Sequence, residues 1–123
     1  MQDGLRTSQA YALGVLSYVH LLRGRPHDAL AMAQAAVQIH AEVGAVQDGE
    51  ILVRLAHAEA LYAVGSPEAG GALAAVRDTL YSRAGRINDV ALRLSFLENI
   101  PENARTVALA RARLPVGPDW PED

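Results

Sequence analysis

The sequence contains no cysteine, so disulfide bonds and thiolate metal sites are excluded from this chain of 123 residues. It also contains no lysine, because all eleven basic residues are arginine. Chemistry that needs a lysine, such as a Schiff base or a phosphate-binding P-loop, therefore cannot come from this chain alone. Aromatic residues make up only 5% of the sequence, and close contacts between helices must replace bulky aromatic side chains in the core.

Long hydrophobic runs are absent as well. No run approaches the ~20 residues that a membrane-spanning helix requires. The first four residues, Met-Gln-Asp-Gly, lack the basic and apolar regions of a signal peptide. We therefore expect a cytoplasmic protein without a membrane segment. The many alanines, together with arginine as the only strongly basic residue, are typical of a bacterial protein encoded by a GC-rich genome.

The net charge is only −3, which is too small to indicate what class of partner the protein binds. Residues 77 to 113 carry seven arginines against four acidic residues and form a mildly basic stretch. Proteins that bind nucleic acids usually have denser basic clusters and a higher isoelectric point. We expect these arginines to form a solvated helix surface. Nucleic-acid binding is an alternative function that ranks after protein binding and homo-oligomerisation.

What the sequence has in abundance is helix-forming residues. Half of the residues are hydrophobic, and many of these are alanine, the strongest helix former. No window shows the alternation of β-branched residues that predicts a strand. The sequence predicts one all-α domain over residues 1–114 and a flexible tail over 115–123, which contains three prolines and three acidic residues. The predicted helices cover about residues 7–23, 26–43, 47–65, 67–85, 89–99 and 101–114.

Two turns of the same kind separate these helices. Gly24 can adopt a positive φ at a helix end, and Pro26 has the fixed φ of a first helical position. The same device returns at Gly65-Ser66-Pro67, where the serine can cap the next helix. Helices joined in pairs predict three stacked antiparallel hairpins.

Small residues predict where helices approach one another. Ala29, Ala33 and Ala36 recur at spacings of four and three, which gives the second helix a narrow face for a neighbouring helix. Gly70 and Gly71 weaken the fourth helix by about 1 kcal/mol each relative to alanine. Such a cost inside a helix often marks close approach by a neighbour.

Acidic residues mark the starts of two later helices. Asp48 is expected to cap the third helix or to lie in its first turn, and Asn88 and Asp89 can cap the fifth, because such side chains accept hydrogen bonds from the first turn. In the fifth helix, Val90, Leu94 and Leu97 form the predicted inward stripe.

The first pair of helices resembles the tetratricopeptide repeat. Leu13, Leu16 and the small Ser17 precede the turn at Gly24, and the three small alanines follow it. In this repeat, a small residue on the first helix meets a small residue on the second, so that the two pack closely. The resemblance covers roughly residues 8–113 and implies a superhelix that binds protein or peptide partners.

The second and third pairs match less completely. Ala58 takes the small site of the second pair, whereas Arg54 and His57 lie where apolar residues are usual. The two turns are forty-one residues apart, more than the ~34 residues of the standard repeat. This spacing is similar to long-helix variants in large bacterial signalling proteins. The segment 89–106 is similar to the closing segment of repeat arrays attached to bacterial Ser/Thr kinases and ATPase-type regulators, although no kinase or ATPase segment is present.

The polar residues do not predict catalysis or a cofactor. The four histidines lack the spacing of a metal site, and Gly24 and Pro26 interrupt the one pair that is seven residues apart. Glu50 and Glu59 are nine residues apart, which places them about half a turn from each other on a helix. We therefore expect no enzyme, no metal and no cofactor. Arg93 and Arg105 could contact a ligand, but we expect them to form salt links that close the last hairpin.

The remaining candidate site is a groove. In a stack of hairpins, the first helix of each pair lines the concave side, where a peptide or a partner helix can bind. The predicted partner-binding residues are Tyr11, Tyr18, Leu21, Leu52, Leu55, Glu59 and Tyr62. The alternative is that several of these residues belong to the core between hairpins. A second alternative function is homo-oligomerisation through the apolar ends of the array, with Tyr11, Val15 or the last helix as the contact.

Overall fold

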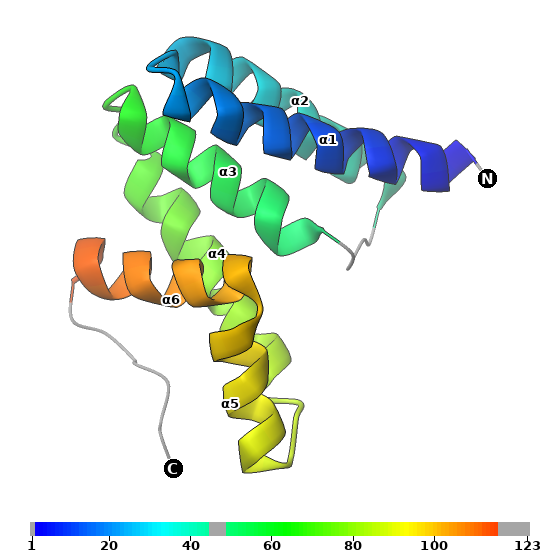
Figure 1. Ribbon diagram of the computed structural model, residues 1–123, viewed down its shortest axis with the longest axis vertical. Helices are drawn as coiled ribbons and strands as arrows, with labels where there is room; N and C mark the ends of the chain where they lie inside the picture. Colours follow the sequence, from blue (N-terminus) through cyan, green and yellow to red (C-terminus); the bar gives the residue numbers. More distant parts are fainter. Residues whose placement is uncertain (1, 45–48, 116–123) are drawn as a thin grey trace.

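The computed structural model describes residues 2–44 and 49–115, which form six helices and contain no strand (Figure 1). The predicted all-α architecture of about six helices is confirmed. The predicted cap at Asp48 and all but the first residue of the predicted tail lie outside the described residues. The helices are α1 (Gln2–Leu22), α2 (Pro26–Val43), α3 (Glu50–Ala63), α4 (Ala69–Ala84), α5 (Val90–Asn99) and α6 (Pro101–Arg113).

The two predicted glycine turns are built alike. Gly24 has a φ of 71° and Gly65 a φ of 75°, both in the left-handed region that favours glycine. The N–H of Arg25 donates to the carbonyl oxygen of His20 at 2.8 Å, and the N–H of Ser66 makes the equivalent bond at 2.9 Å. This Schellman arrangement satisfies carbonyl groups at the helix end and turns the chain toward the next helix.

Small side chains let α1, α2 and α3 pack closely. Ser17 of α1 is fully buried, and its hydroxyl donates to the carbonyl oxygen of Ala29 at 2.8 Å. Ala29 and Ala33 of α2 form a buried cluster with Ala60 of α3. Ala36 is also fully buried. The predicted narrow face of α2 is therefore confirmed.

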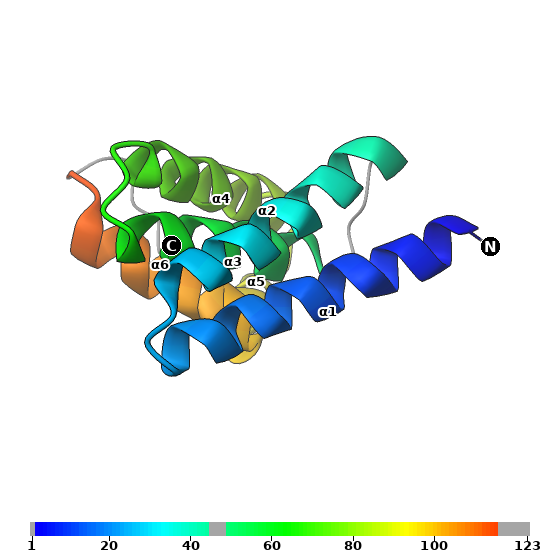
Figure 2. The same ribbon diagram turned by 90° about the horizontal axis from the view of Figure 1, so that it is seen from above.

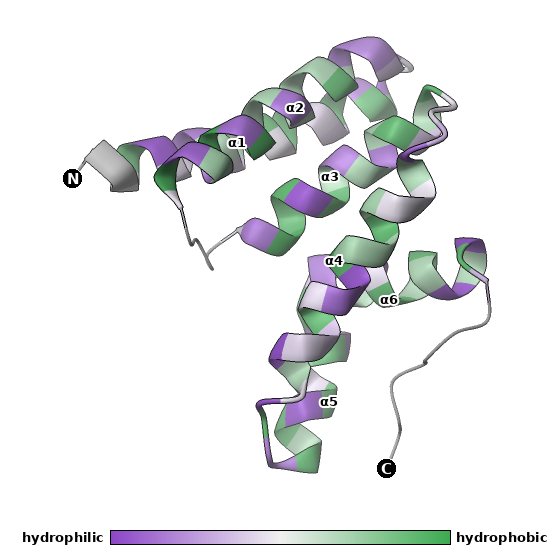
Figure 3. Cartoon of the chain, turned by 180° about the vertical axis from the view of Figure 1, so that it is seen from behind, coloured by the Kyte–Doolittle hydropathy of each residue, from purple (hydrophilic) through white to green (hydrophobic). Residues whose placement is uncertain are grey.

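The central helix is α3, which contacts α1, α2, α4 and α6 (Figures 1 and 2). The main core cluster combines Leu55 of α3 with Leu73, Val76 and Leu80 of α4 and Leu97 of α5. Hydrophobic and hydrophilic residues are interspersed along the helices (Figure 3). The hydrophobic residues recur at helical spacing, and helices α3 to α6 turn apolar sides toward this core. Helices α1 and α2 pack against α3 through two smaller clusters.

Helices α1 and α3 approach each other closely at Gly14. A Cβ atom added at Gly14 would lie 3.0 Å from Leu52 Cδ2 and 3.4 Å from Val53 Cγ2. The prediction of close approach at Gly71 is wrong, because a Cβ there would have no neighbour within 4 Å. At Gly70 a Cβ would make only an ordinary contact, 3.8 Å from the Tyr62 hydroxyl.

The third pair of helices differs from the first two. Among the described residues, α5 contacts α4 and α6 but not α3, and it is α6 that packs against both α3 and α4. Helix α6 runs across α5 rather than back along it (Figure 1). Ile100 alone caps the end of α5 and the start of α6, and its backbone is extended because a proline follows. One residue cannot carry the chain across the ~8–10 Å between antiparallel helices.

The inward face of α5 is narrower than predicted. Asp89 caps the helix as expected, since its carboxylate accepts a hydrogen bond from the Leu92 N–H at 2.9 Å. Leu97 is buried and Leu94 is partly buried, but Val90 is 50% exposed. The first turn of α5 extends beyond the neighbours that would cover it.

Two helices begin elsewhere than predicted. Helix α1 begins at Gln2, about one turn earlier than expected, and Arg6 in this extension forms an ion pair with Glu42 of α2. The ion pair attaches the added turn to its neighbour. Helix α3 begins at Glu50, after Gly49 in the left-handed conformation with a φ of 78°.

Candidate functional site

Glu59 connects three helices on the face where the groove was predicted. Its Oε2 accepts a hydrogen bond from the Tyr18 hydroxyl of α1 at 2.7 Å. Arg105 of α6 donates from Nε and Nη2 to the two oxygens of the carboxylate, at 2.6 Å each. Such a two-point pair is strong and directional. Only 12% of the Glu59 side chain is exposed. The prediction that Arg105 closes the last hairpin is wrong, because its ion pair is made to α3 and not to α5.

The electrostatics of this cluster keep its protonation states constant. Burial raises the pKa of Tyr18, and the negative charge of Glu59 raises it further. The hydrogen bonds to Glu59 raise the pKa of Arg105. Near neutral pH, the hydroxyl therefore remains a donor and the guanidinium remains charged. The cluster acts as a permanent link between α1, α3 and α6.

Tyr62 is also covered by α6. The guanidinium carbon of Arg113 lies 4.6 Å from the centroid of the Tyr62 ring, in the range of a cation–π contact. The ring packs in turn against the main core cluster. Glu59 and Tyr62 thus contact α6 of the same chain, and Tyr18 is joined to α6 through Glu59, which leaves much less of this face open to a partner.

The other predicted groove residues are dispersed. Leu55 does not line a groove, because it is fully buried at the centre of the main core. Leu21 packs against the small-residue cluster between α1, α2 and α3, and Leu52 lies against α1. Tyr11 is 46% exposed, with its ring against Gly49 at the start of α3. Only Tyr11 offers a large open surface.

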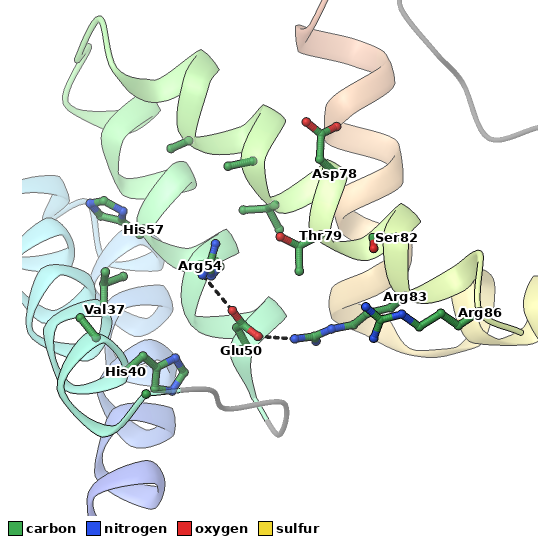
Figure 4. Close-up of a pocket in the computed structure, with 15 residues that line it drawn as sticks. Val37, His40, Glu50, Arg54, His57, Asp78, Thr79, Ser82, Arg83 and Arg86 are labelled. Carbon is green, nitrogen blue, oxygen red and sulfur yellow. Dashed lines mark hydrogen bonds and ion pairs between the residues drawn. The ribbon is translucent and has the colours of Figure 1, made fainter.

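A cleft of about 910 Å³ lies on the opposite side of α3, between α2 and α4 (Figure 4). Glu50, Arg54 and His57 line it from α3, and their spacings of four and three place them on one helix face. Helices α2 and α4 both pack against α3, but among the described residues they do not contact each other. Their separation leaves the cleft.

The charges of the cleft gather around Glu50. Arg54 forms an ion pair with Glu50, with 2.9 Å between Nη2 and Oε2, and Arg83 of α4 forms an ion pair with Oε1 across the cleft (Figure 4). A single carboxylate is therefore shared by two guanidinium groups. Arg86, just after α4, also lines the cleft, is exposed, and forms no ion pair within the described part of the chain. Asp78 of α4 also lines the cleft and pairs with Arg77 at 3.1 Å, so three arginines and two carboxylates line the cleft.

Two histidines line the cleft beside these charges. Burial lowers the pKa of His40 on α2, and the nearby Arg54 lowers it further against the opposing effect of Glu50. Burial likewise lowers the pKa of His57, against the opposing effect of Glu68. Both rings are neutral at pH 7. The positive charge of the cleft near neutral pH therefore comes from its arginines.

The sequence carried a signal for this cleft. Arg54 and His57 occupy positions at which the tetratricopeptide repeat usually has apolar residues. Both side chains face the cleft (Figure 4). Polar residues at expected core positions therefore indicate the open side of the helix. Arg83 and Arg86 lie near these two side chains because of how α4 packs, and the spacing of residues along the sequence does not predict that packing.

None of the helices in residues 2–44 and 49–115 is long and apolar enough to cross a membrane. The same residues contain no group of three or more histidine or acidic side chains that could hold a metal ion. No family model, no curated protein and no solved structure matches the chain.

Proposed function

We propose that this chain is a non-catalytic, tetratricopeptide-like interaction module that binds an acidic segment of a partner protein in the cleft between α2, α3 and α4. The observation that carries the proposal is the convergence of Arg54, Arg83 and Arg86 on one cleft, in which Glu50 pairs with Arg54 and Arg83 and leaves Arg86 exposed. Guanidinium groups recognise carboxylates in a two-point geometry.

The shape of the cleft supports a peptide rather than a small ligand. It is open along α4, whose wall carries Ala72, Ala75 and Val76, followed by the hydroxyl groups of Thr79 and Ser82 (Figure 4). Small apolar residues allow a peptide backbone or a helix to come close. A segment with apolar residues at one end and acidic residues at the other would meet complementary groups.

The state of Glu50 supports a binding role. Its carboxylate is already held by Arg54 and Arg83, and these ion pairs keep both guanidinium groups at the cleft. An acidic partner can take over one of these guanidinium groups or the exposed Arg86. The resemblance of segment 89–106 to the end of bacterial repeat arrays supports a place for the module in a bacterial regulatory protein.

A labelled hexaglutamate peptide tests the proposal by fluorescence polarisation. We expect saturable binding that weakens as salt is added, because the contacts are ionic. Arg86→Ala should weaken binding by roughly 3- to 10-fold, in line with the loss of one partly screened charge pair. Arg25→Ala, which removes an exposed arginine outside the cleft, is the matched control.

Two results would contradict the proposal. In the first, the wild-type chain shows no binding to hexaglutamate, or binds hexalysine equally well. In the second, Arg25→Ala and Arg86→Ala weaken binding by the same factor, which would indicate general attraction to arginines. If Tyr62→Ala weakened peptide binding and Arg86→Ala did not, the binding site would lie on the face that α6 partly covers.

A further inference from the structure

The side of α1 that faces away from α2 and α3 is apolar along most of its length. Most of the exposed large hydrophobic side chains in the described part of the chain lie on this helix, with exposed fractions from 37% to 88%. They are Leu5, Tyr11, Val15, Leu16, Val19 and Leu22. Single exposed hydrophobic residues are ordinary, but a continuous apolar strip on one helix marks an interaction surface.

The strip has the spacing of a coiled-coil seam. Its central line alternates steps of three and four residues over three heptads, which is the a and d pattern of paired helices. The members of this line are Leu5, Ser8, Ala12, Val15, Val19 and Leu22, and all are exposed. Tyr11 and Leu16 widen the strip on its two sides. Helix α1 lies along one edge of the molecule (Figure 2), and among the described residues it contacts only α2 and α3.

We propose that α1 pairs antiparallel with α1 of a second copy of this chain. In the antiparallel register centred between Ala12 and Val15, Leu5 lies opposite Leu22 of the other copy. Ser8 then lies opposite Val19, and Ala12 opposite Val15. Each pair joins an a position to a d position, and the small residues face larger ones, as close packing requires. A parallel pair would instead place Ser8 against Ser8 and Ala12 against Ala12, with voids between them.

The area of the strip fits a two-fold dimer. From the exposed fractions, these side chains offer roughly 600 Å² per copy, given side-chain areas of about 150–230 Å². Two copies together would bury about 1,200 Å², the lower end of the range for specific interfaces. A two-fold axis uses the same strip twice, so no second complementary surface is needed. Val90 and Leu92, the exposed large hydrophobic residues outside α1, are too few to cover it.

Sedimentation velocity over a range of concentrations tests the pairing. We expect the mass of the wild-type chain to rise from 13.1 kDa to twice that value. Val15→Glu or Leu22→Glu should keep the chain at 13.1 kDa, with an unchanged circular dichroism spectrum because both side chains are already solvent-exposed. Ala31→Glu adds the same charge to the exposed side of α2 and should leave the dimer intact. Ser8→Leu should tighten the dimer roughly tenfold by filling the seam.

Cysteine crosslinking tests the orientation, and the absence of native cysteine makes it specific. We expect a mixture of Leu5→Cys and Leu22→Cys chains to form the mixed disulfide, since residues 5 and 22 of one helix are about 25 Å apart and only antiparallel pairing brings them together. Predominant Leu5→Cys homodisulfides would overturn the register. A wild-type chain that stays at 13.1 kDa at every concentration, or a Val15→Glu chain that dimerises normally, would overturn the interface.

Discussion

Removing the Tyr18 hydroxyl tests whether the link between α1, α3 and α6 stabilises the fold. Tyr18→Phe deletes the hydrogen bond to Glu59 Oε2, which is 2.7 Å long. Hydrogen bonds to charged groups contribute about 1.5–3 kcal/mol. Glu59 keeps both bonds from Arg105, so its charge does not become unpaired. We therefore expect the free energy of unfolding to fall by about 1.5–2 kcal/mol, at the lower end of that range.

Thermal unfolding followed by circular dichroism measures the effect. For a chain of this size, the loss corresponds to a decrease in Tm of roughly 4–10 °C. Urea unfolding at fixed temperature should give the same free-energy difference, with an unchanged dependence on urea concentration. The measurements are made at a protein concentration at which wild type and variant have the same mass.

Tyr62→Phe is the matched control, because it removes a hydroxyl from another partly buried tyrosine and leaves the ring under Arg113 in place. We expect its free energy of unfolding to remain within about 0.5 kcal/mol of wild type. The reasoning is refuted if Tyr18→Phe and Tyr62→Phe have equal effects. It is also refuted if Tyr18→Phe loses as much stability in the background of Glu59→Ala, which lacks the acceptor, as in wild type.

Three further changes test other parts of the fold. Leu55→Ala should lower the free energy of unfolding by about 2–5 kcal/mol in urea denaturation, because Leu55 is fully buried in the main core, and a loss below 1 kcal/mol would contradict that position. Gly71→Ala should raise Tm, since alanine is favoured by about 1 kcal/mol in a helix and its Cβ has open space. Gly14→Val should lower Tm, because its side chain would crowd Leu52 and Val53. The opposite order of the two Tm values would refute the assigned contact between α1 and α3. Stability should fall as pH decreases below about 6.5, because His40 and His57 have lowered pKa values in the folded protein and the unfolded chain therefore takes up protons first. The loss should level off below the folded pKa values, and it should be smaller in His57→Gln; an equal loss in that variant would exclude His57 as a source.

Local features were predictable from the sequence because they depend on neighbours in the chain. Gly24 and Gly65 end helices because glycine accepts the left-handed conformation that the turn requires. The spacing of Ala29, Ala33 and Ala36 identified the face of α2 that is buried against other helices. Asp89 caps α5 from the position at which its carboxylate reaches the first turn.

The tertiary structure decided which neighbour covers each apolar face. Helical spacing shows that Leu55 and Tyr62 lie on an apolar side of α3, but it does not show whether a partner or the same chain lies against them. Because Ile100 leaves no room for a hairpin turn, α6 crosses to α3 and covers part of the predicted groove. The same packing separates α2 from α4 and brings Arg54 and Arg83 to Glu50. The sequence alone thus determined the turns at Gly24 and Gly65 and the buried face of α2. Contacts between distant segments, which depend on how whole helices pack, determined which surfaces remain open.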